Sequence, residues 1–188
     1  MIRAFLGLDL PEPIRRALSV PQFLLPLPRR VDPGLMHLSL VFLGEVTDHG
    51  LEAAHESFAA FRTVAFPLTL QGLGLFGGDR PRAAYAAVAP SAPLTHLQAK
   101  AERAARAAGL HPEHRRFVPH VTLGRFSPPP FAQAASLERA IAETPFTAGP
   151  WQVTDMVLWQ SHLGPKGPRY DELARYPFEA APRTATDP

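Results

Sequence analysis

Two short segments of the sequence carry an imidazole and a hydroxyl two residues apart. The first reads HLSL, with His37 and Ser39, and the second reads HVTL, with His120 and Thr122. Residues i and i+2 of a β-strand point to the same face. Each segment would therefore present both polar groups on one side and bury its apolar residues on the other. His55 also precedes a hydroxyl by two positions, but its helical surroundings would separate the two side chains.

This combination of residue types suits acid–base chemistry at a phosphate. One neutral imidazole can remove a proton while a second, protonated one donates a proton, because the ordinary histidine pKa lies near ~6.5. The two hydroxyls can donate hydrogen bonds to the non-bridging phosphate oxygens. These steps need neither a metal nor a cofactor, so we expect none. The alternative is that two unrelated strands each carry a histidine near the end of a sheet.

The elements that must position these groups alternate between strand and helix, which favours an α+β fold. The motifs lie in strands predicted at 37–43 and within 117–126. The other predicted strands are 3–10, 66–76, 82–89, 146–153 and 156–160, and 170–178 is predicted as a last strand or a turn. The predicted helices are 12–18, 48–61 (capped by Asp48), 93–108 and 131–142, and the predicted loops are 21–33 and 164–169. Strands 66–76 and 82–89 should form a hairpin, and the tail 181–188 should be flexible.

Composition excludes several other classes of protein. A chain of 188 residues with 46% hydrophobic and 19% charged residues fits one globular domain. No apolar run reaches the roughly 18 residues of a transmembrane helix, and the apolar start meets Asp9 too soon for a signal peptide. The absence of cysteine removes disulfides, thiolate metal sites and cysteine nucleophiles. We therefore expect a cytoplasmic monomer with no membrane partner.

The charge pattern permits a phosphate-bearing partner without showing one. The 19 basic residues are 17 Arg and 2 Lys against 17 acidic residues, which gives a net charge of only +2. Arginine favours bidentate contacts with phosphate. The candidates to follow an RNA backbone are Arg29, Arg30, Arg80, Arg82, Arg115 and Arg116. Solvated surface charge is the equally weighted alternative for each of them.

Aromatic and further histidine side chains offer weaker signals. Phe76 and Tyr85 are candidates to stack on a base, whereas Phe5 and Phe42 are expected in the apolar core. His111 and His114 have an i, i+3 spacing that could bind a metal on a helix. Pro112 lies between them and no carboxylate partner is evident, so we interpret both as loop residues.

As a whole, the chain resembles the two-histidine phosphoesterase superfamily, and within it the bacterial and archaeal RNA 2′,3′-cyclic phosphodiesterases, long labelled 2′-5′ RNA ligases. The resemblance covers about residues 2–176 and rests on RAFLGLDLP, MHLSLVFLGE, LTLQGLGLFGGDRPRAAYAAV, FVPHVTLGRF and SHLGPKGPRY. It implies one bilobal domain over residues 1–180. Each of its two pseudo-symmetric lobes would be an antiparallel sheet backed by helices, with the active-site cleft between the lobes.

The resemblance also implies roles for the site residues. It makes His37 the proton donor and His120 the proton acceptor, while Ser39 and Thr122 hold the phosphate. Arg125 matches the arginine that often follows the second motif, which adds a cation at the phosphate. Three further residues are candidates to line the cleft, namely Tyr85, His162 and Tyr170, and a surface position is the favoured alternative for His162.

Ser39 is a departure from the family pattern, where threonine is usual. Serine keeps the hydroxyl but lacks the methyl group that restricts the side-chain rotamers. We expect weaker orientation of this hydroxyl and retained function.

The implied activity is metal-independent hydrolysis of RNA 2′,3′-cyclic phosphate ends to 2′-phosphate ends, with ATP-independent 2′-5′ ligation as its reverse. The implied partner is RNA with such ends, including tRNA fragments. Two alternatives stay open. One is a phosphodiesterase that acts on a small cyclic-phosphate nucleotide, and the other is a non-catalytic module that binds RNA ends. The presence of both histidines favours catalysis.

Overall fold

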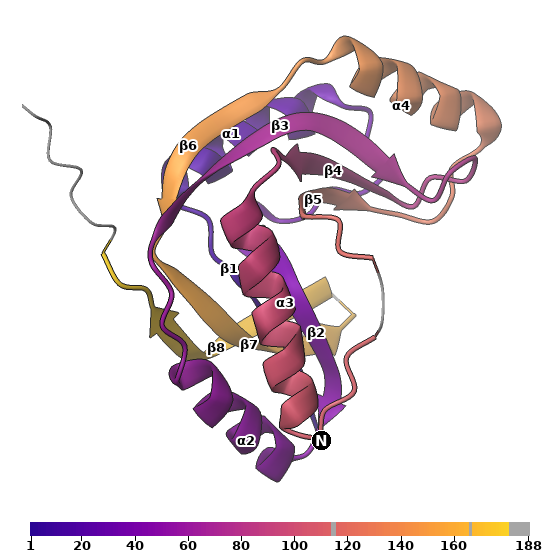
Figure 1. The fold of residues 1–188 in the computed structure, drawn as a ribbon. Coiled ribbons are helices and arrows are strands. Elements are labelled where there is room, and N and C mark those ends of the chain that lie inside the picture. Colours follow the sequence, from indigo (N-terminus) through magenta and orange to yellow (C-terminus); the bar gives the residue numbers. More distant parts are fainter. Residues whose placement is uncertain (114–115, 166, 181–188) are drawn as a thin grey trace, which may run out of the picture.

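The computed structural model describes residues 1–113, 116–165 and 167–180, and these residues form an α+β fold (Figure 1). The strands are β1 (Ile2–Leu8), β2 (Leu38–Val46), β3 (Phe66–Phe76), β4 (Ala83–Val88), β5 (His120–Arg125), β6 (Thr147–Val153), β7 (Asp155–Gly164) and β8 (Gly167–Pro177). The helices are α1 (Glu12–Leu24), α2 (Asp48–Ala59), α3 (Ala92–Ala107) and α4 (Phe131–Glu143), with a 3₁₀ turn η1 (Pro33–Leu35).

All eight strands join one sheet in the order β6-β3-β4-β5-β2-β1-β7-β8, and neighbouring strands are antiparallel. The expected antiparallel α+β fold is confirmed. The two sheets implied by the resemblance are four-stranded halves of this one sheet. They meet at β2 and β5, where the register pairs Leu38 with Val121. The strands that carry the two motifs are therefore the central neighbours of the whole sheet.

The same order of elements occurs in both halves, because β1-α1-β2 is followed later by β4-α3-β5. Each helix crosses to the other half. Helix α1 contacts β5 and β6, and helix α3 contacts β2. Figure 1 shows α3 lying along β2 while α1 lies beside β6. The C-terminal hairpin β7–β8 completes the first half beyond β1, and β3 and β6 complete the second half beyond β4.

Alternation along the strands separates two apolar layers. The main core lies between the sheet and the helices and contains Leu38 and Leu123, both fully buried. On β7, Leu158 joins this core, while its neighbours Val157 and Trp159 belong to a second cluster with Phe5. Because successive residues of a strand face opposite sides, the second cluster covers the other face of the sheet.

Several predicted boundaries are wrong for tertiary reasons. Helix α1 continues through Pro21 to Leu24, where a loop was expected from residue 21. The expected loop 164–169 is mostly strand, because β7 and β8 pair as far as Gly164 and Gly167. The cap of α2 is Thr47, whose side chain accepts from the Gly50 amide, and not Asp48. The expected hairpin β3–β4 is confirmed. The expected flexible tail 181–188 lies outside the described residues.

No helix in the described part of the chain is long and apolar enough to span a membrane.

Candidate active site

The pairing of β2 with β5 brings the two motifs together. Leu38 and Val121 occupy the second position of each motif and lie opposite each other in an antiparallel register. Position 37 therefore lies across from position 122, and position 39 across from position 120. Leu38 and Val121 are fully buried in the core, so the flanking polar residues share the opposite face of the sheet. The predicted placement of imidazole and hydroxyl on one face is confirmed.

Both motif strands carry a β-bulge at the same place. In the first half, Leu6 pairs with Val41 and Gly7 with Ser39, so Leu40 is the extra residue. In the second half, the pairing skips Leu123 in the same way, immediately after Thr122. A bulge redirects the side chains next to it and is frequent beside active sites. The hydroxyl residues thus lie in matching local distortions of the two halves.

The two histidines are fixed by equivalent hydrogen bonds. Nδ1 of His37 donates to the carbonyl oxygen of Leu35 at 2.8 Å, and Nδ1 of His120 donates to that of Val118 at 2.6 Å. Each bond places the proton of the neutral imidazole on Nδ1 and leaves Nε2 as an acceptor. The Ser39 hydroxyl uses this acceptor and donates to His37 Nε2 at 3.1 Å. Both imidazoles therefore direct a basic nitrogen away from the backbone.

Burial makes both histidines weaker bases than usual. Desolvation, reinforced by the charges of Arg125, His120 and Arg15, lowers the pKa of His37 to about 4. Desolvation and the charge of Arg125 also lower the pKa of His120. The backbone hydrogen bonds act in the opposite direction but do not prevail. Both imidazoles are neutral near pH 7 in the ligand-free site, and among the described residues the charge of Arg125 acts on both.

The second apolar cluster surrounds His37 with aromatic rings. The ring centroids of Phe5, Tyr170 and Trp159 lie 4.8, 5.2 and 5.6 Å from that of His37. Tyr170, predicted to line the cleft, meets the imidazole edge-on at 88°. Burial raises the pKa of the Tyr170 hydroxyl, while the positive charges of Arg125 and Arg3 lower it. Tyr170 therefore lies beside the proposed proton donor and within the field of two arginines.

His120 has a smaller aromatic neighbourhood on β3 and β4. Its ring centroid is 4.8 Å from that of Phe76 and 5.5 Å from that of Tyr85, which stack on each other at 4.2 Å. Both residues were candidates to stack on a base, and the structure places both beside a motif histidine. Phe5 is buried as expected, but Phe42 is 53% exposed, so its predicted place in the core is wrong. Phe42 follows the bulge in β2 and lies on the outer side of the aromatic cluster.

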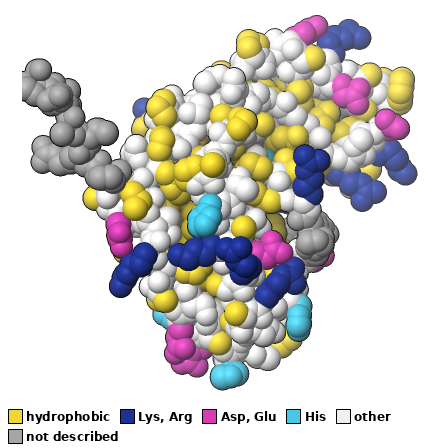
Figure 2. Space-filling model, in the orientation of Figure 1, with side chains coloured by type: hydrophobic (Ala, Val, Ile, Leu, Met, Phe, Trp, Pro, Cys, Tyr) yellow, Lys and Arg dark blue, Asp and Glu magenta, His cyan; other side chains and the backbone are white. Residues whose placement is uncertain are grey.

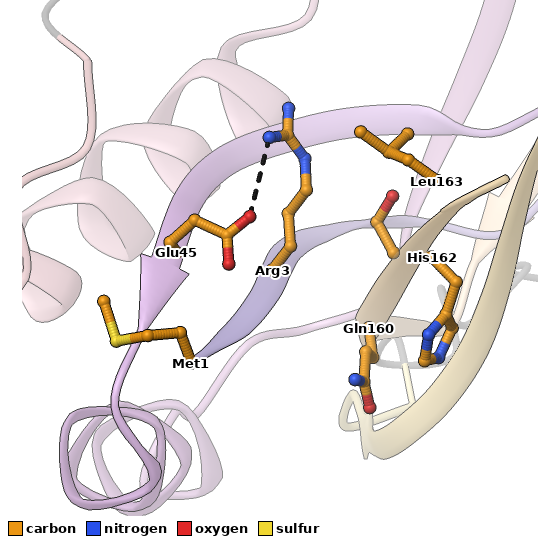
Figure 3. Close-up of a pocket in the computed structure, with 7 residues that line it drawn as sticks. Met1, Arg3, Glu45, Gln160, His162 and Leu163 are labelled. Atoms are coloured by element: carbon orange, nitrogen blue, oxygen red, sulfur yellow. Dashed lines mark ion pairs between the residues drawn. The ribbon is translucent and has the colours of Figure 1, made fainter.

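His162 lies apart from the two motif histidines. It lines a surface pocket of about 270 Å³ where β1, β2 and β7 meet, and its Nε2 is 3.0 Å from Oδ2 of Asp171. Figure 3 shows Arg3 facing Glu45 across this pocket, with His162 on the neighbouring strand. The structure gives no contact between His162 and His37 or His120 among the described residues.

The candidate RNA-contacting arginines fall into two groups, one that binds the protein's own backbone and one that is exposed. Arg30 is used structurally, since its guanidinium donates to the Gln22 and Phe23 carbonyls at the end of α1. Arg29, Arg80, Arg82 and Arg116 are exposed. Arg115 and His114 lie outside the described residues, so the pairs 115–116 and His111/His114 are only half described. Figure 2 shows a band of Lys and Arg over α3, on the helical face, which is the side of the sheet opposite the motif histidines.

Residues with no assigned role in the sequence also shape the site. Trp159 packs against His37, Arg15 binds the backbone before it, and Gln22 binds the backbone after Thr122. Arg15 and Trp159 gave no local signal, because neither belongs to a motif. Gln22 lay in the predicted loop, although a polar residue within an apolar helical stretch would have been a signal. Across residues 1–113, 116–165 and 167–180, no three His, Asp or Glu side chains gather as a metal site.

The fold and the site define a class of protein, in which two duplicated strands each place an imidazole and a hydroxyl on one face for acid–base chemistry. A family model described as "2'-5' RNA ligase superfamily" matches residues 11–165. The chain belongs to this superfamily.

Curated relatives and solved structures agree with this assignment. The chain is 33% identical over 156 residues to a protein of Aeropyrum pernix named RNA 2′,3′-cyclic phosphodiesterase, covering 81% of this chain and 86% of that one. It is 31% identical over 149 residues to a Geobacillus stearothermophilus protein of the same name, covering 78% of this chain but only 46% of that relative. The crystal structure of E. coli LigT complexed with 3′-AMP superposes with a TM-score of 0.78 at 25% identity, over 94% of this chain and 98% of that one.

Proposed function

We propose that this chain hydrolyses RNA 2′,3′-cyclic phosphate ends to 2′-phosphate ends. The observation that carries the proposal is the pairing of Leu38 with Val121, which sets two imidazole–hydroxyl pairs on one face of the sheet. The names of the curated relatives supply the substrate class. Both pairs are needed for an acid–base reaction at one phosphate, and a protein that only bound RNA ends would need neither imidazole.

The reaction follows from two proton transfers. His120 Nε2 removes a proton from water, whose oxygen attacks the phosphorus of the cyclic phosphate. The bond from phosphorus to the 3′ oxygen breaks, and His37 Nε2 donates a proton to that leaving oxygen. The products are a 2′-phosphate and a free 3′ hydroxyl. Ser39 and Thr122 donate hydrogen bonds to the non-bridging oxygens, and Arg125 offsets the negative charge that grows on them.

Binding of the substrate provides the protonated imidazole that the proposed reaction needs. Near pH 7 the free site holds two neutral imidazoles, because burial lowers both histidine pKa values. A bound cyclic phosphate carries a negative charge, and a nearby negative charge raises the pKa of an imidazole. The proposed roles require that His37, and not His120, takes up this proton when the substrate binds. The surrounding aromatic rings then keep water from competing for that proton.

Ligation would use the same groups in the same roles, with His120 taking the proton of the attacking hydroxyl and His37 protonating the departing 3′ oxygen. An RNA 5′ hydroxyl in place of water would attack a cyclic phosphate and form a 2′-5′ linkage without ATP. The partner in either direction is RNA with a cyclic phosphate end, including tRNA fragments. A small cyclic-phosphate nucleotide is the second candidate substrate, because the similar structure of E. coli LigT is complexed with a mononucleotide, 3′-AMP.

A panel of cyclic-phosphate substrates tests the proposal, from a mononucleotide to short RNAs and tRNA halves, each assayed with and without an RNA 5′ hydroxyl. We expect release of 2′-phosphate ends and a higher kcat/KM for RNA than for the mononucleotide. A preference for the mononucleotide would support the second candidate. Binding of RNA ends without turnover would overturn catalysis.

A further inference from the structure

Helix α1 carries two polar residues on the face that it turns toward the motif strands. Arg15 and Gln22 are seven positions apart, which is about two helical turns, so they lie on the same side of the helix. The side chain of Arg15 is 17% exposed, and Gln22 is 5% exposed, the one buried polar residue in the described part of the chain. Two inward-facing polar side chains on a helix require partners, and both have them.

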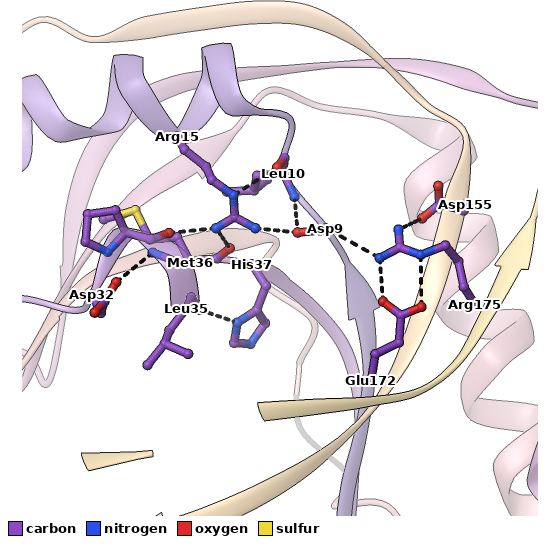
Figure 4. Close-up of polar contacts among 12 residues, drawn as sticks. Asp9, Leu10, Arg15, Asp32, Leu35, Met36, His37, Asp155, Glu172 and Arg175 are labelled. Carbon is purple, nitrogen blue, oxygen red and sulfur yellow. Dashed lines mark hydrogen bonds and ion pairs between the residues drawn. The ribbon is translucent and has the colours of Figure 1, made fainter. Parts of the chain in front are cut away.

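Arg15 binds the backbone immediately before His37 (Figure 4). Its Nη1 donates to the carbonyl oxygens of Pro33 at 2.6 Å and Met36 at 2.7 Å, and its Nε donates to that of Leu10 at 3.0 Å. The remaining Nη2 binds the Asp9 carboxylate, to which Arg175 of β8 also approaches at 3.4 Å. The guanidinium is therefore committed to protein partners and is not a phosphate ligand.

The short segment between the two Arg15-bound carbonyls orients His37. Gly34 and Leu35 lie between Pro33 and Met36, and the Leu35 carbonyl accepts the hydrogen bond from His37 Nδ1. If the 3₁₀ turn moved, the Leu35 carbonyl would move with it, and the imidazole would lose its fixed tautomer and direction. Arg15 thus acts on His37 through the backbone.

Gln22 binds the backbone immediately after Thr122. Its Nε2 donates to the carbonyl of Leu123 at 2.8 Å and to that of Val31 at 2.7 Å. The Val31 amide also donates to the Leu123 carbonyl, at 2.9 Å. Leu123 is the extra residue of the β5 bulge, whose backbone groups cannot all pair within the sheet. Gln22 gives this carbonyl a second hydrogen bond and ties it to Val31, which supports the distorted backbone beside Thr122.

We propose that Arg15 and Gln22 are positioning residues, through which α1 holds the His37 strand and the Thr122 strand in one catalytic arrangement. This inference rests on the proposed function. One rigid helix contacts both strands, so the spacing of its two side chains sets where the two motif segments lie relative to each other. A misplacement of about 1 Å at reacting groups can reduce the rate by roughly 10²-fold.

Single methionine substitutions, each made in the otherwise unchanged chain, test the proposal. Arg15→Met and Gln22→Met keep side-chain bulk and remove the hydrogen bonds. Arg16→Met, at an exposed neighbour on the same helix, and Gln133→Met, at an exposed position of α4, are the controls. We expect kcat on an RNA cyclic phosphate to fall by about 10- to 100-fold in the two test variants, with KM changed less than about threefold, and no change in the controls.

A second readout separates positioning from general destabilisation. A cyclic phosphate ester with an activated aryl leaving group does not need a proton from His37. The kcat defect of Arg15→Met should therefore shrink on that substrate, whereas the defect of Gln22→Met should persist. Circular dichroism and thermal melts confirm that each variant is folded at the assay temperature. If Arg15→Met does not fold, Arg15→Lys, which keeps the charge without the fork of donors, takes its place.

The outcomes are distinct. Wild-type kcat in both folded test variants would overturn the inference, as would an equal defect of the Arg15 variant on both substrates. Absence of activity in the wild type and the controls would instead contradict the proposed function on which the inference rests.

Discussion

The two halves of the sheet carry the same motif in different surroundings. Both histidines donate from Nδ1 to the carbonyl two residues earlier, and both hydroxyl residues precede a bulge. His37, however, lies among three aromatic rings of β1, β7 and β8 and follows a turn bound by Arg15. His120 contacts two rings of β3 and β4, and the Val118 carbonyl that orients it is in an exposed segment.

The difference shows which parts of the molecule carry the proposed reacting groups and which parts distinguish them. The proposed reacting groups lie on β2 and β5, which are equivalent strands. The distinguishing contacts at His37 come from the C-terminal hairpin and from α1, which have no equivalent contacts at His120 in the described residues. Two equivalent imidazoles can therefore take different roles without any change in the motif itself.

The strongest way to break the comparison is to remove each histidine in turn. We expect His37→Ala and His120→Ala each to reduce kcat/KM by about 10²–10⁴-fold on RNA cyclic phosphates. On a substrate with an activated aryl leaving group, His37→Ala should recover part of its rate, because the leaving oxygen needs no proton, while His120→Ala should not recover. Steady-state rates on the two substrates check this. Recovery of His120→Ala alone would reverse the two roles.

The hydroxyl residues test whether the two halves contribute equally to phosphate binding. Ser39→Ala and Thr122→Ala should each lose about 1.5–3 kcal/mol of transition-state stabilisation, from kcat/KM measurements, because each removes a hydrogen bond to a charged oxygen. Ser39→Thr should match or exceed the wild type, since threonine has a stiffer χ1. A folded Ser39→Thr variant without activity would contradict a phosphate-ligand role for the Ser39 hydroxyl.

The pH dependence tests how the two surroundings divide one proton between the histidines. In the proposed mechanism the active form carries one proton on the two histidines, and its population peaks between their two pKa values. Burial lowers both, that of His37 to about 4. We therefore expect kcat/KM to peak on the acid side of pH 6.5 and to fall by about tenfold per pH unit at higher pH. A flat profile of kcat/KM from pH 5 to 9, with chemistry limiting, would contradict a shared proton.

The smallest expected effect is that of a chelator. If one of the two histidines bound a metal, the two halves would differ in their chemistry and not only in the residues around each histidine. We expect kcat to be unchanged after dialysis against EDTA, because the proposed mechanism uses two imidazoles for its proton transfers and two hydroxyls with Arg125 for the phosphate. Loss of activity that one divalent cation restores would replace the acid–base pair with a metal-assisted mechanism.

The sequence predicted that each motif sets its imidazole and hydroxyl on one face, and it missed the residues that hold the two motif segments in place. Alternation along a strand is a local property, so the shared face of His37 and Ser39 could be derived from spacing alone. The end of α1 could not, because Pro21 is a local signal to stop the helix, while Gln22 gains its partners from Val31 and Leu123. The same limit applies to Trp159, which meets His37 only because β7 pairs with β1, a pairing that no local pattern specifies.

The crossing of α1 to the far half has a consequence for how the protein is made. Gln22 and its partner Leu123 are 101 residues apart, so this contact must wait for most of the chain to leave the ribosome. Contacts between distant residues form late and slow folding, because a long loop must close first. The duplicated order of elements suggests that the two halves of the sheet are separate units. However, α1 packs on β5 and β6 of the second half, and α3 packs on β2 of the first half. A chain cut between α2 and β3 should therefore yield two fragments that fold only in each other's presence.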